Sequence, residues 1–432
     1  MIKKSQMRKA IIFLLAVYLL FPACSNESKR RNTNIPTDST YVTLPLNNPT
    51  VNVYIENSGS MDGYVKGVTE FEQLVYNYLT EIEILDLTDS LNLFYINSEI
   101  IPQGSDISNF IEKLDPDNFK AKGGKRGISD ISQVLKLVLS ETNEDEIAIL
   151  ITDGIFSPGK GKNAAEYLLN QQIGIKSTMA QYLKTYPNTA VAVYQLSSQF
   201  DGYYYNREDS QIKINDKRPF YIWLFGDFRN IAILKEKIRE DQFKGGVVEH
   251  AYTILPALQT EIQYAILNSP KNGSFERDKK ASKTSIYNIK KETKGKNEGK
   301  FMFTIGVDLS LFNVLLGDEY LMDTDSYARL VNKKASSDLF VEINHNENTS
   351  QKYTHNMQLS CEKIPVGDLE IVLMNRMPQW VYDLNDEEGF DIKANNAISK
   401  TFGIKYLVEG IFEAYDMLGN NIYAKMNLKL NK

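Results

Sequence analysis

The chain is poor in the side chains that build disulfide networks and soft-metal sites. Its 432 residues include only two cysteines and three histidines. Two cysteines are too few for the disulfide framework of a small stapled domain. One candidate set of transition-metal ligands consists of His345, His355 and Cys361. These residues lack the ligand spacing of a transition-metal site, so the sequence predicts none there. Ordinary hydrophobic cores must therefore stabilise the fold.

Long apolar runs are also scarce, and the composition of 42% hydrophobic and 24% charged residues argues against a multi-span membrane protein or a disordered chain. The one sustained run, 10–21, follows four basic residues and is too short to span a bilayer comfortably. It ends at Pro22-Ala23-Cys24. This order predicts a secretory signal over residues 1–23.

Cys24 stands where a bacterial lipobox places the cysteine that is acylated, although Phe21 and Pro22 are looser matches to that motif. We therefore expect an exported lipoprotein of the bacterial cell envelope, anchored to a membrane through lipid on Cys24. Plain secretion and an uncleaved anchor are the alternatives, and the sequence does not distinguish the inner from the outer membrane. An acylated Cys24 leaves Cys361 without an intramolecular disulfide partner.

Positive charge is in deficit. The formal net charge is −6, and it becomes −10 once residues 1–23 and their four basic side chains are removed. A chain this acidic repels phosphates, so we expect no non-specific nucleic-acid binding.

The pattern of polar and apolar residues divides residues 24–432 into three regions. Residues 24–48 are polar and predict a flexible tether. Residues 49–255 alternate strands with amphipathic helices, which predicts an α/β domain with a doubly wound, mainly parallel sheet and an inserted hairpin at about 200–217. Residues 256–432 carry alternating apolar runs between turns, which predicts a β-rich, sandwich-like C-terminal domain.

Three segments of the α/β region concentrate hydroxyls and carboxylates. Glu56, Ser58 and Ser60 follow the first strand, Ser129 opens a helix, and Asp153 follows the apolar strand 147–151. In a doubly wound sheet such loops meet beyond the carboxyl ends of the strands. Oxygen ligands without histidine or cysteine suit Mg²⁺ or Mn²⁺, with Ca²⁺ less favoured.

These three segments resemble the metal-ion-dependent adhesion site of the von Willebrand factor type A (vWA) family, and the resemblance covers about residues 51–239. The family's Asp-x-Ser-x-Ser motif is matched by Glu56, Ser58 and Ser60. Its threonine is matched by Ser129, and its later aspartate by Asp153 in a Thr-Asp-Gly context. The resemblance implies a Rossmann-type α/β fold and a bound divalent cation.

Two positions depart from the family pattern. Ser129 keeps the hydroxyl, whereas Glu56 is one methylene longer than the family's aspartate. The longer side chain either binds the ion directly or crowds it out, and Mg²⁺ tolerates such a shift poorly. The alternative is that Ser58, Ser60 and Asp153 only cap loops and helix starts.

The resemblance implies a binding or adhesion protein whose protein or peptide partner supplies an acidic residue to the ion. A metal-independent scaffold of an envelope complex is the main alternative. A metal-assisted hydrolase is less favoured, since all three histidines lie from position 250 onward and no nucleophile–base pair is evident, so we do not expect an enzyme. The basic loop 122–126 is either a solvated loop or a feature that steers an acidic partner.

Overall fold

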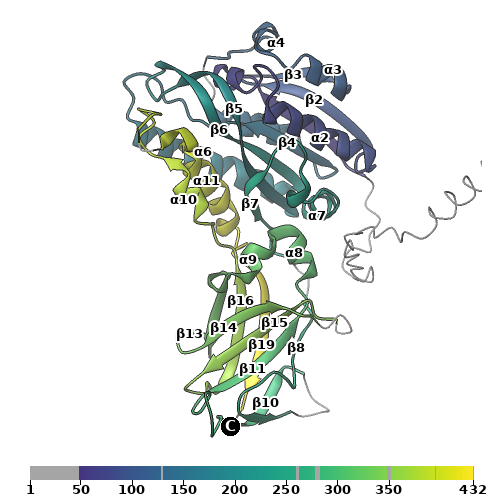
Figure 1. Cartoon of the computed structure of the whole chain (residues 1–432), viewed down its shortest axis with the longest axis vertical. Helices are drawn as coiled ribbons and strands as arrows, with labels where there is room; N and C mark the ends of the chain where they lie inside the picture. The colour runs from purple at the N-terminus through teal and green to yellow at the C-terminus, as the bar shows by residue number, and fades with distance from the viewer. Residues whose placement is uncertain are drawn as a thin grey trace, which may run out of the picture. The chain divides into compact units, whose positions relative to one another are not determined.

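The structure is a computed structural model that describes residues 48–127, 130–258, 262–277, 283–347, 352–394 and 396–431. The signal, Cys24 and nearly all of the tether lie outside the described residues. Within these ranges, every helix is too short or too polar to cross a bilayer. The fold is mixed α/β over the first half and β-rich over much of the second (Figure 1).

A seven-stranded sheet forms the centre of the first half, in the order β3-β2-β1-β4-β6-β5-β7. Its central strands β2, β1 and β4 pair in parallel, and the remaining neighbours pair antiparallel. The strand bounds are β1 Thr50–Glu56, β2 Ser90–Ile96, β3 Ile100–Gly104, β4 Glu146–Thr152, β5 Thr189–Tyr205, β6 Gln211–Asp227 and β7 Val248–Ile254.

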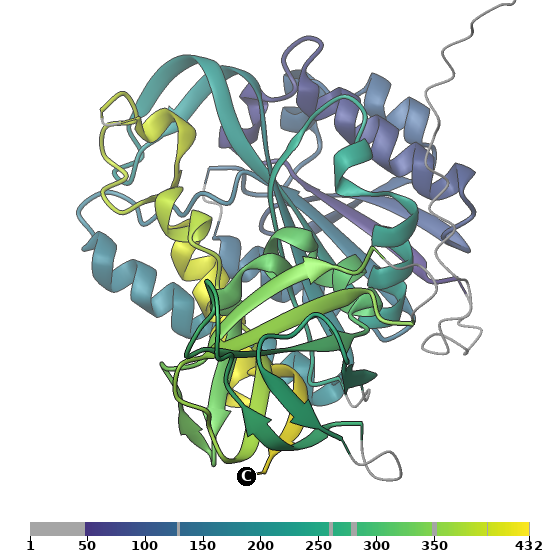
Figure 2. The ribbon, with the colours of Figure 1, turned by 60° about the horizontal axis from the view of Figure 1, so that its bottom comes forward.

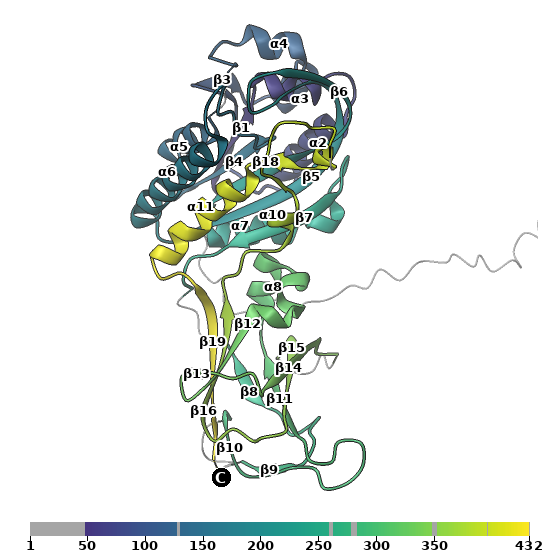
Figure 3. The same ribbon diagram turned by 90° about the vertical axis from the view of Figure 1, so that its left-hand side faces the viewer.

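Helices cover both faces of this sheet (Figure 3). The chain leaves β1 for β2 in one direction along the sheet and leaves β4 for β5 in the other, so right-handed crossovers place α2 and α6 on opposite faces. This is why β1 and β4 are buried almost throughout. The helix bounds are α2 Glu70–Ile84, α3 Ile107–Glu112, α4 Pro116–Ala121, α5 Ile131–Ser140, α6 Ala164–Thr185 and α7 Phe228–Lys237.

Strands β5 and β6 form one continuous ribbon, and the hairpin expected at 200–217 is the outer end of this ribbon. They pair in unbroken antiparallel register from Thr189↔Asp227 to Tyr205↔Gln211. The side chain of Asn206 accepts the amides of Glu208 and Ser210 and closes the turn. Because so short a connection permits only antiparallel pairing, β6 lies antiparallel between β4 and β5. The parallel order predicted from the sequence therefore holds for β2, β1 and β4 and ends at β6.

The β-rich part contains a six-stranded sheet, β13-β12-β16-β19-β10-β9, and a four-stranded sheet, β14-β15-β11-β8. Figure 2 turns these strands toward the viewer. All neighbours pair antiparallel except β10 and β19. The bounds are β8 Tyr264–Ile266, β9 Ser274–Glu276, β10 Ser285–Lys290, β11 Phe301–Val307, β12 Tyr327–Val331, β13 Lys334–Ala335, β14 Phe340–His345, β15 His355–Cys361, β16 Gly367–Met374 and β19 Ile422–Leu430, with helices α8 Ser310–Leu316 and α9 Asp318–Met322.

After β16 the chain returns to the α/β part before it forms β19. This return segment holds α10 (Trp380–Asp383), β17 (Asn385–Asp386), β18 (Thr401–Phe402) and α11 (Ile404–Met417). Helix α11 packs lengthwise on α6 (Figure 3). Glu413 accepts a hydrogen bond from Gln172 and pairs with Lys176 at 3.0 Å. The region after residue 256, which is β-rich as expected, thus also contributes a helix to the α/β core.

Candidate functional site

Two of the three predicted loops meet at the carboxyl ends of β1 and β4. β1 ends at Glu56 and runs through Ser58 into a single turn of 3₁₀ helix, η1 (Gly59–Gly63). β4 ends at Thr152, and Asp153 follows directly. Because β1 and β4 are parallel neighbours with Ile55 opposite Ile151, both loops leave the same edge of the sheet. We call this group, Glu56, Ser58, Ser60 and Asp153, the edge site.

The two serines face each other. Ser58 is 2% exposed, and its hydroxyl lies 3.0 Å from that of Ser60, which is half-buried. Ser58 occupies the N-cap position of η1, yet in the part of the chain that the structure describes its side chain accepts no capping hydrogen bond. The capping alternative predicted such a bond. The Ser58 hydroxyl is instead directed to its neighbour in the site.

Asp153 is buried with one oxygen engaged and one unsatisfied. Its side chain is 2% exposed, and Oδ1 accepts the amide of Ile155 at 3.2 Å, as a loop cap does. Burial raises the pKa of this carboxyl, while the nearby Ser60 hydroxyl and the Ile155 amide lower it in part. Even so, no described residue reaches Oδ2 with normal hydrogen-bond geometry. A buried carboxylate oxygen without a partner is energetically costly.

Glu56 extends along the same edge. It is 1% exposed, and its Oε2 accepts a hydrogen bond from the hydroxyl of Thr152, which itself accepts the amide of Gly154 at 2.8 Å. The extra methylene of Glu56 therefore carries its carboxylate toward the end of β4. Sequence reasoning placed Thr152 only as context for Asp153 and missed this contact.

Ser129, the third predicted element, lies outside the described residues. The next residue, Asp130, is the N-cap of α5, and its Oδ1 accepts the amides of Ser132 and Gln133. The helix that Ser129 precedes thus begins where the sequence predicted, to within a few residues.

The basic loop 122–126 anchors the edge site through Arg126. The Arg126 guanidinium donates to the carbonyls of Asn57 and Ser58 at 2.6 and 3.2 Å and pairs with Asp62. Its own carbonyl accepts the amide of Gly59 at 3.1 Å. Arg126 is therefore not part of a merely solvated loop, whereas a steering role for the loop stays a prediction. Arg126 holds the serine-bearing turn in place.

Two buried asparagines complete this support, and no motif in the sequence indicated them. Asn97 donates to Oδ1 of Asn57 at 2.7 Å and to the carbonyl of Gly123 at 3.2 Å, and Asn57 donates to the carbonyl of Phe119 at 3.3 Å. Gly124 has φ +76, and a Cβ on it would overlap the Asn97 amide. The loops after β1 and β2 and the basic loop are therefore locked together.

A buried arginine adds positive charge close to Asp153. Arg218, on β6, is 1% exposed, lies over the ring of Tyr204 and donates to the carbonyl of Ile398 at 3.2 Å. Its charge is one of the influences that lower the pKa of Asp153.

The β5–β6 ribbon and the return segment both contact loops that carry the edge site. A Cβ on Gly63 would lie 2.4 Å from the ring of Phe200, so the ribbon rests directly on η1. On the other side, the amide of Phe156 donates to the carbonyl of Phe402, and Tyr221 donates to the hydroxyl of Thr401 at 3.0 Å. Residues far apart in sequence thereby fix the loop that carries Asp153.

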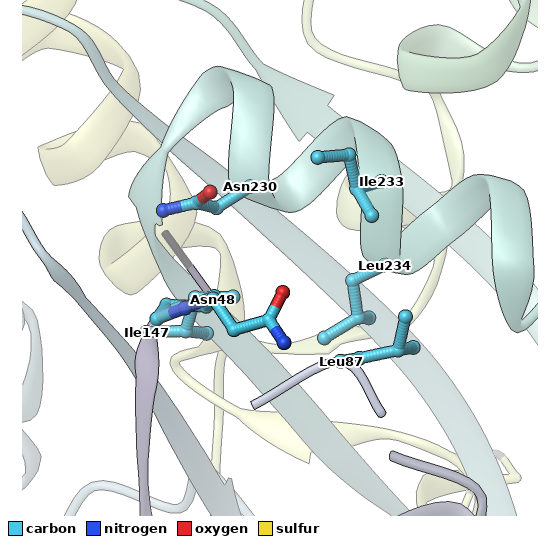
Figure 4. A pocket seen from close by; sticks show the side chains of 7 residues that line it. Asn48, Leu87, Ile147, Asn230, Ile233 and Leu234 are labelled. Atoms are coloured by element: carbon cyan, nitrogen blue, oxygen red, sulfur yellow. The ribbon is translucent and has the colours of Figure 1, made fainter. Parts of the chain in front are cut away.

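A small pocket lies at the other end of the same strands (Figure 4). Figure 4 shows Asn48 and Asn230 facing it beside Leu87, Ile147, Ile233 and Leu234. Its lining residues, as far as the structure describes them, carry no charge. It is therefore distinct from the edge site and offers no charged ligand for a cation.

In comparisons with known proteins, the chain matches no family model, no curated protein and no solved structure.

The described side chains of the edge site fit a hard divalent cation. Two hydroxyls and a carboxylate are oxygen ligands of the kind that Mg²⁺ and Mn²⁺ take in proteins. The unsatisfied Oδ2 of Asp153 is the atom that such an ion would engage. The ion would supply positive charge and an open coordination position for an acidic partner.

Proposed function

We propose that this protein is an exported, lipid-anchored bacterial envelope protein that binds a protein or peptide partner through a vWA-like cation site. The observation that carries the proposal is Asp153, whose carboxylate is buried with Oδ2 unsatisfied beside the Ser60 hydroxyl. Mg²⁺ or Mn²⁺ would bind between Asp153, Ser58 and Ser60, with Ser129 and Glu56 as further ligands. A carboxylate from the partner would complete the coordination shell.

The fold supports this proposal in its first four strands. The order β3-β2-β1-β4, with β3 antiparallel at the edge, places the Ser58 and Asp153 loops side by side. Ligand sites of open α/β sheets form at such carboxyl edges. Because a fold by itself does not define a function, the proposal rests on the residues of the edge site and not on the sheet.

A metal-independent scaffold is the second candidate, and Arg218 is the observation that favours it. A buried guanidinium near Asp153 supplies positive charge without an ion. In that case the edge site would be a fixed structural network, and partner binding would not respond to chelators.

A peptide-display experiment tests the proposed function. A random peptide library is selected on the mature protein in millimolar Mn²⁺ and eluted with EDTA. We expect enriched peptides to contain Asp or Glu, to lose binding when that residue becomes Asn or Gln, and to fail to bind Asp153→Ala. Asp145→Ala, at the opposite end of β4 and exposed, is the matched control and should bind normally.

Enriched peptides that bind equally in EDTA, or that bind Asp153→Ala as well as wild type, would contradict the cation-dependent mechanism and favour the scaffold. Release of cleaved peptide during the selection would instead point to the hydrolase.

A further inference from the structure

A second group of potential metal ligands lies in the β-rich part, far along the chain from the edge site. Asp318, His345 and His355 each offer one ligand atom, and these three atoms lie within 4.8 Å of one another. Nε2 of His345 is 3.3 Å from Oδ2 of Asp318, and the two imidazole rings have centroids 4.9 Å apart. Two of the chain's three histidines therefore converge on one carboxylate.

Strand register brings the two histidines together. His345 is the last residue of β14 and His355 the first of β15, and they are directly opposed in the antiparallel pair. On the far side of β15, Val307 of β11 is opposed to His355, so His355 sits between two strands. Asp318 opens α9, which packs against β14. Directly opposed side chains of a sheet have Cβ atoms about 5 Å apart, which is a suitable separation for two ligands of one ion.

His355 is prepared to act as a ligand. It is 1% exposed, and its Nδ1 lies 2.9 Å from the hydroxyl of Thr354. The hydroxyl also lies 3.4 Å from the carbonyl of Val307, and when it donates to that carbonyl the imidazole proton is on Nδ1. Nε2 then carries the lone pair, and it is buried without a hydrogen-bond partner in the described structure. A hydrogen bond from the other ring nitrogen is the usual means of orienting a metal-bound histidine.

The charge state of His355 agrees with this geometry. Burial, reinforced by neighbouring His345, lowers the pKa of His355 to about 4, despite the opposing influence of Asp318 and Asp308. The imidazole is therefore neutral at physiological pH, as a metal ligand must be. An ordinary surface ion pair between His345 and Asp318 would leave the buried Nε2 of His355 unexplained.

We propose that Asp318, His345 and His355 form a binding site for a divalent transition ion, with Zn²⁺ as the best fit. Two imidazoles and one carboxylate are a recurrent zinc ligand set that leaves a fourth position for water or another ligand. Bonds of about 2.1 Å place tetrahedral ligands about 3.4 Å apart. The side chains of His345 and Asp318 are 52% and 56% exposed, so they are free to close the remaining distance around His355.

Zinc binding to purified mature protein tests the site, with Zn²⁺ alone as the probe. We expect isothermal titration and metal analysis after dialysis to give a single Zn²⁺ per chain. His345→Gln should weaken binding by more than the roughly 10–100-fold that loss of an outer-shell partner costs. Asp318→Asn should also weaken it. Because His345 is exposed, its variant remains folded even if His355→Gln does not.

Two controls give the result its meaning. His250→Gln changes the third histidine, which stacks on Trp380 outside the cluster, and should bind Zn²⁺ normally. Asp153→Asn disables the edge site and should also retain Zn²⁺, so failure of the proposed function does not affect this test. Zinc binding that survives His345→Gln, that is lost in His250→Gln or Asp153→Asn, or that is absent from the wild type would overturn the proposal.

Discussion

Asp153→Asn is expected to make the metal-free protein more stable at neutral pH and to abolish its stabilisation by Mg²⁺ or Mn²⁺. Burial of this carboxylate without a partner for Oδ2 penalises the charged form, and the neutral amide removes that penalty. In the wild type, an ion at ten times its Kd adds about 1.4 kcal/mol of stability. For an unfolding unit of roughly 200 residues this is a rise in melting temperature of about 3 °C.

The sign of the pH dependence follows from the direction of the pKa shift. The pKa of Asp153 is raised in the folded state above its unfolded value of about 3.9. The folded protein therefore holds the proton more tightly, and this contribution to stability is fully present below the unfolded pKa. It is lost as the pH rises through the folded pKa. Metal-free wild type should thus be destabilised between acidic and neutral pH relative to Asp153→Asn.

Denaturation of both proteins at mildly acidic and neutral pH, with EDTA or with millimolar Mg²⁺, measures these effects. With added ion, the stability of the wild type should instead rise from acidic to neutral pH, because the carboxylate that binds the ion must be deprotonated. An Asp153→Asn protein that is less stable than the wild type without metal, or that still responds to Mg²⁺, would contradict the assignment of Asp153.

Gly410→Ala is expected to destabilise the protein by about 1–3 kcal/mol, as overpacking of a closed core does. Gly410 lies where α11 packs on α6, and a Cβ there would be 2.9 Å from the carbonyl oxygen of Gln172 and 2.8 Å from a methyl carbon of Ile175. Relieving this overlap would require a shift of the α6 backbone, which is energetically costly. This cost exceeds the 0.5–1 kcal/mol by which alanine is usually favoured over glycine within a helix.

Gly174→Ala is the matched control. Gly174 lies in the middle of α6, where a Cβ would meet no described heavy atom within 4 Å. The same substitution should therefore stabilise the protein by about 0.5–1 kcal/mol. Urea unfolding compares the two variants. If Gly410→Ala were as stable as Gly174→Ala, α11 would not be packed on α6 as described.

The Gly410 variant also links the return segment to the edge site. The start of α11 and the residues before it contact Gly154 and Phe156, directly after Asp153. Loosening α11 should weaken the stabilisation by Mg²⁺, whereas Gly174→Ala should leave it unchanged.

Local patterns in the sequence were sufficient to predict the secondary-structure elements nearest the edge site. The apolar run 147–151 predicted a buried central strand, and β4 is buried from Ile147 to Thr152. The Glu56, Ser58 and Asp153 segments were predicted to meet at one sheet edge, and the parallel pairing of β1 with β4 brings them there.

Long-range pairings were not encoded in any local pattern. Nothing near Gly410 indicated that α11 would pack on α6, more than 200 residues earlier in the chain. The sequence predicted a hairpin at about 200–217 but not that β6 would separate β5 from β4. His345 and His355 show no ligand spacing along the chain because strand register, rather than a short motif, brings them together.

Direct Mn²⁺ binding is the most decisive measurement for the edge site. The paramagnetic signal of free Mn²⁺ is followed while the ion is titrated with mature protein carrying His345→Gln, which removes the second proposed site. We predict a single bound Mn²⁺ per chain in this protein, and none when Asp153→Asn is added. Mn²⁺ binding that is absent from the first protein, or unchanged in the second, would contradict the edge site as a cation site.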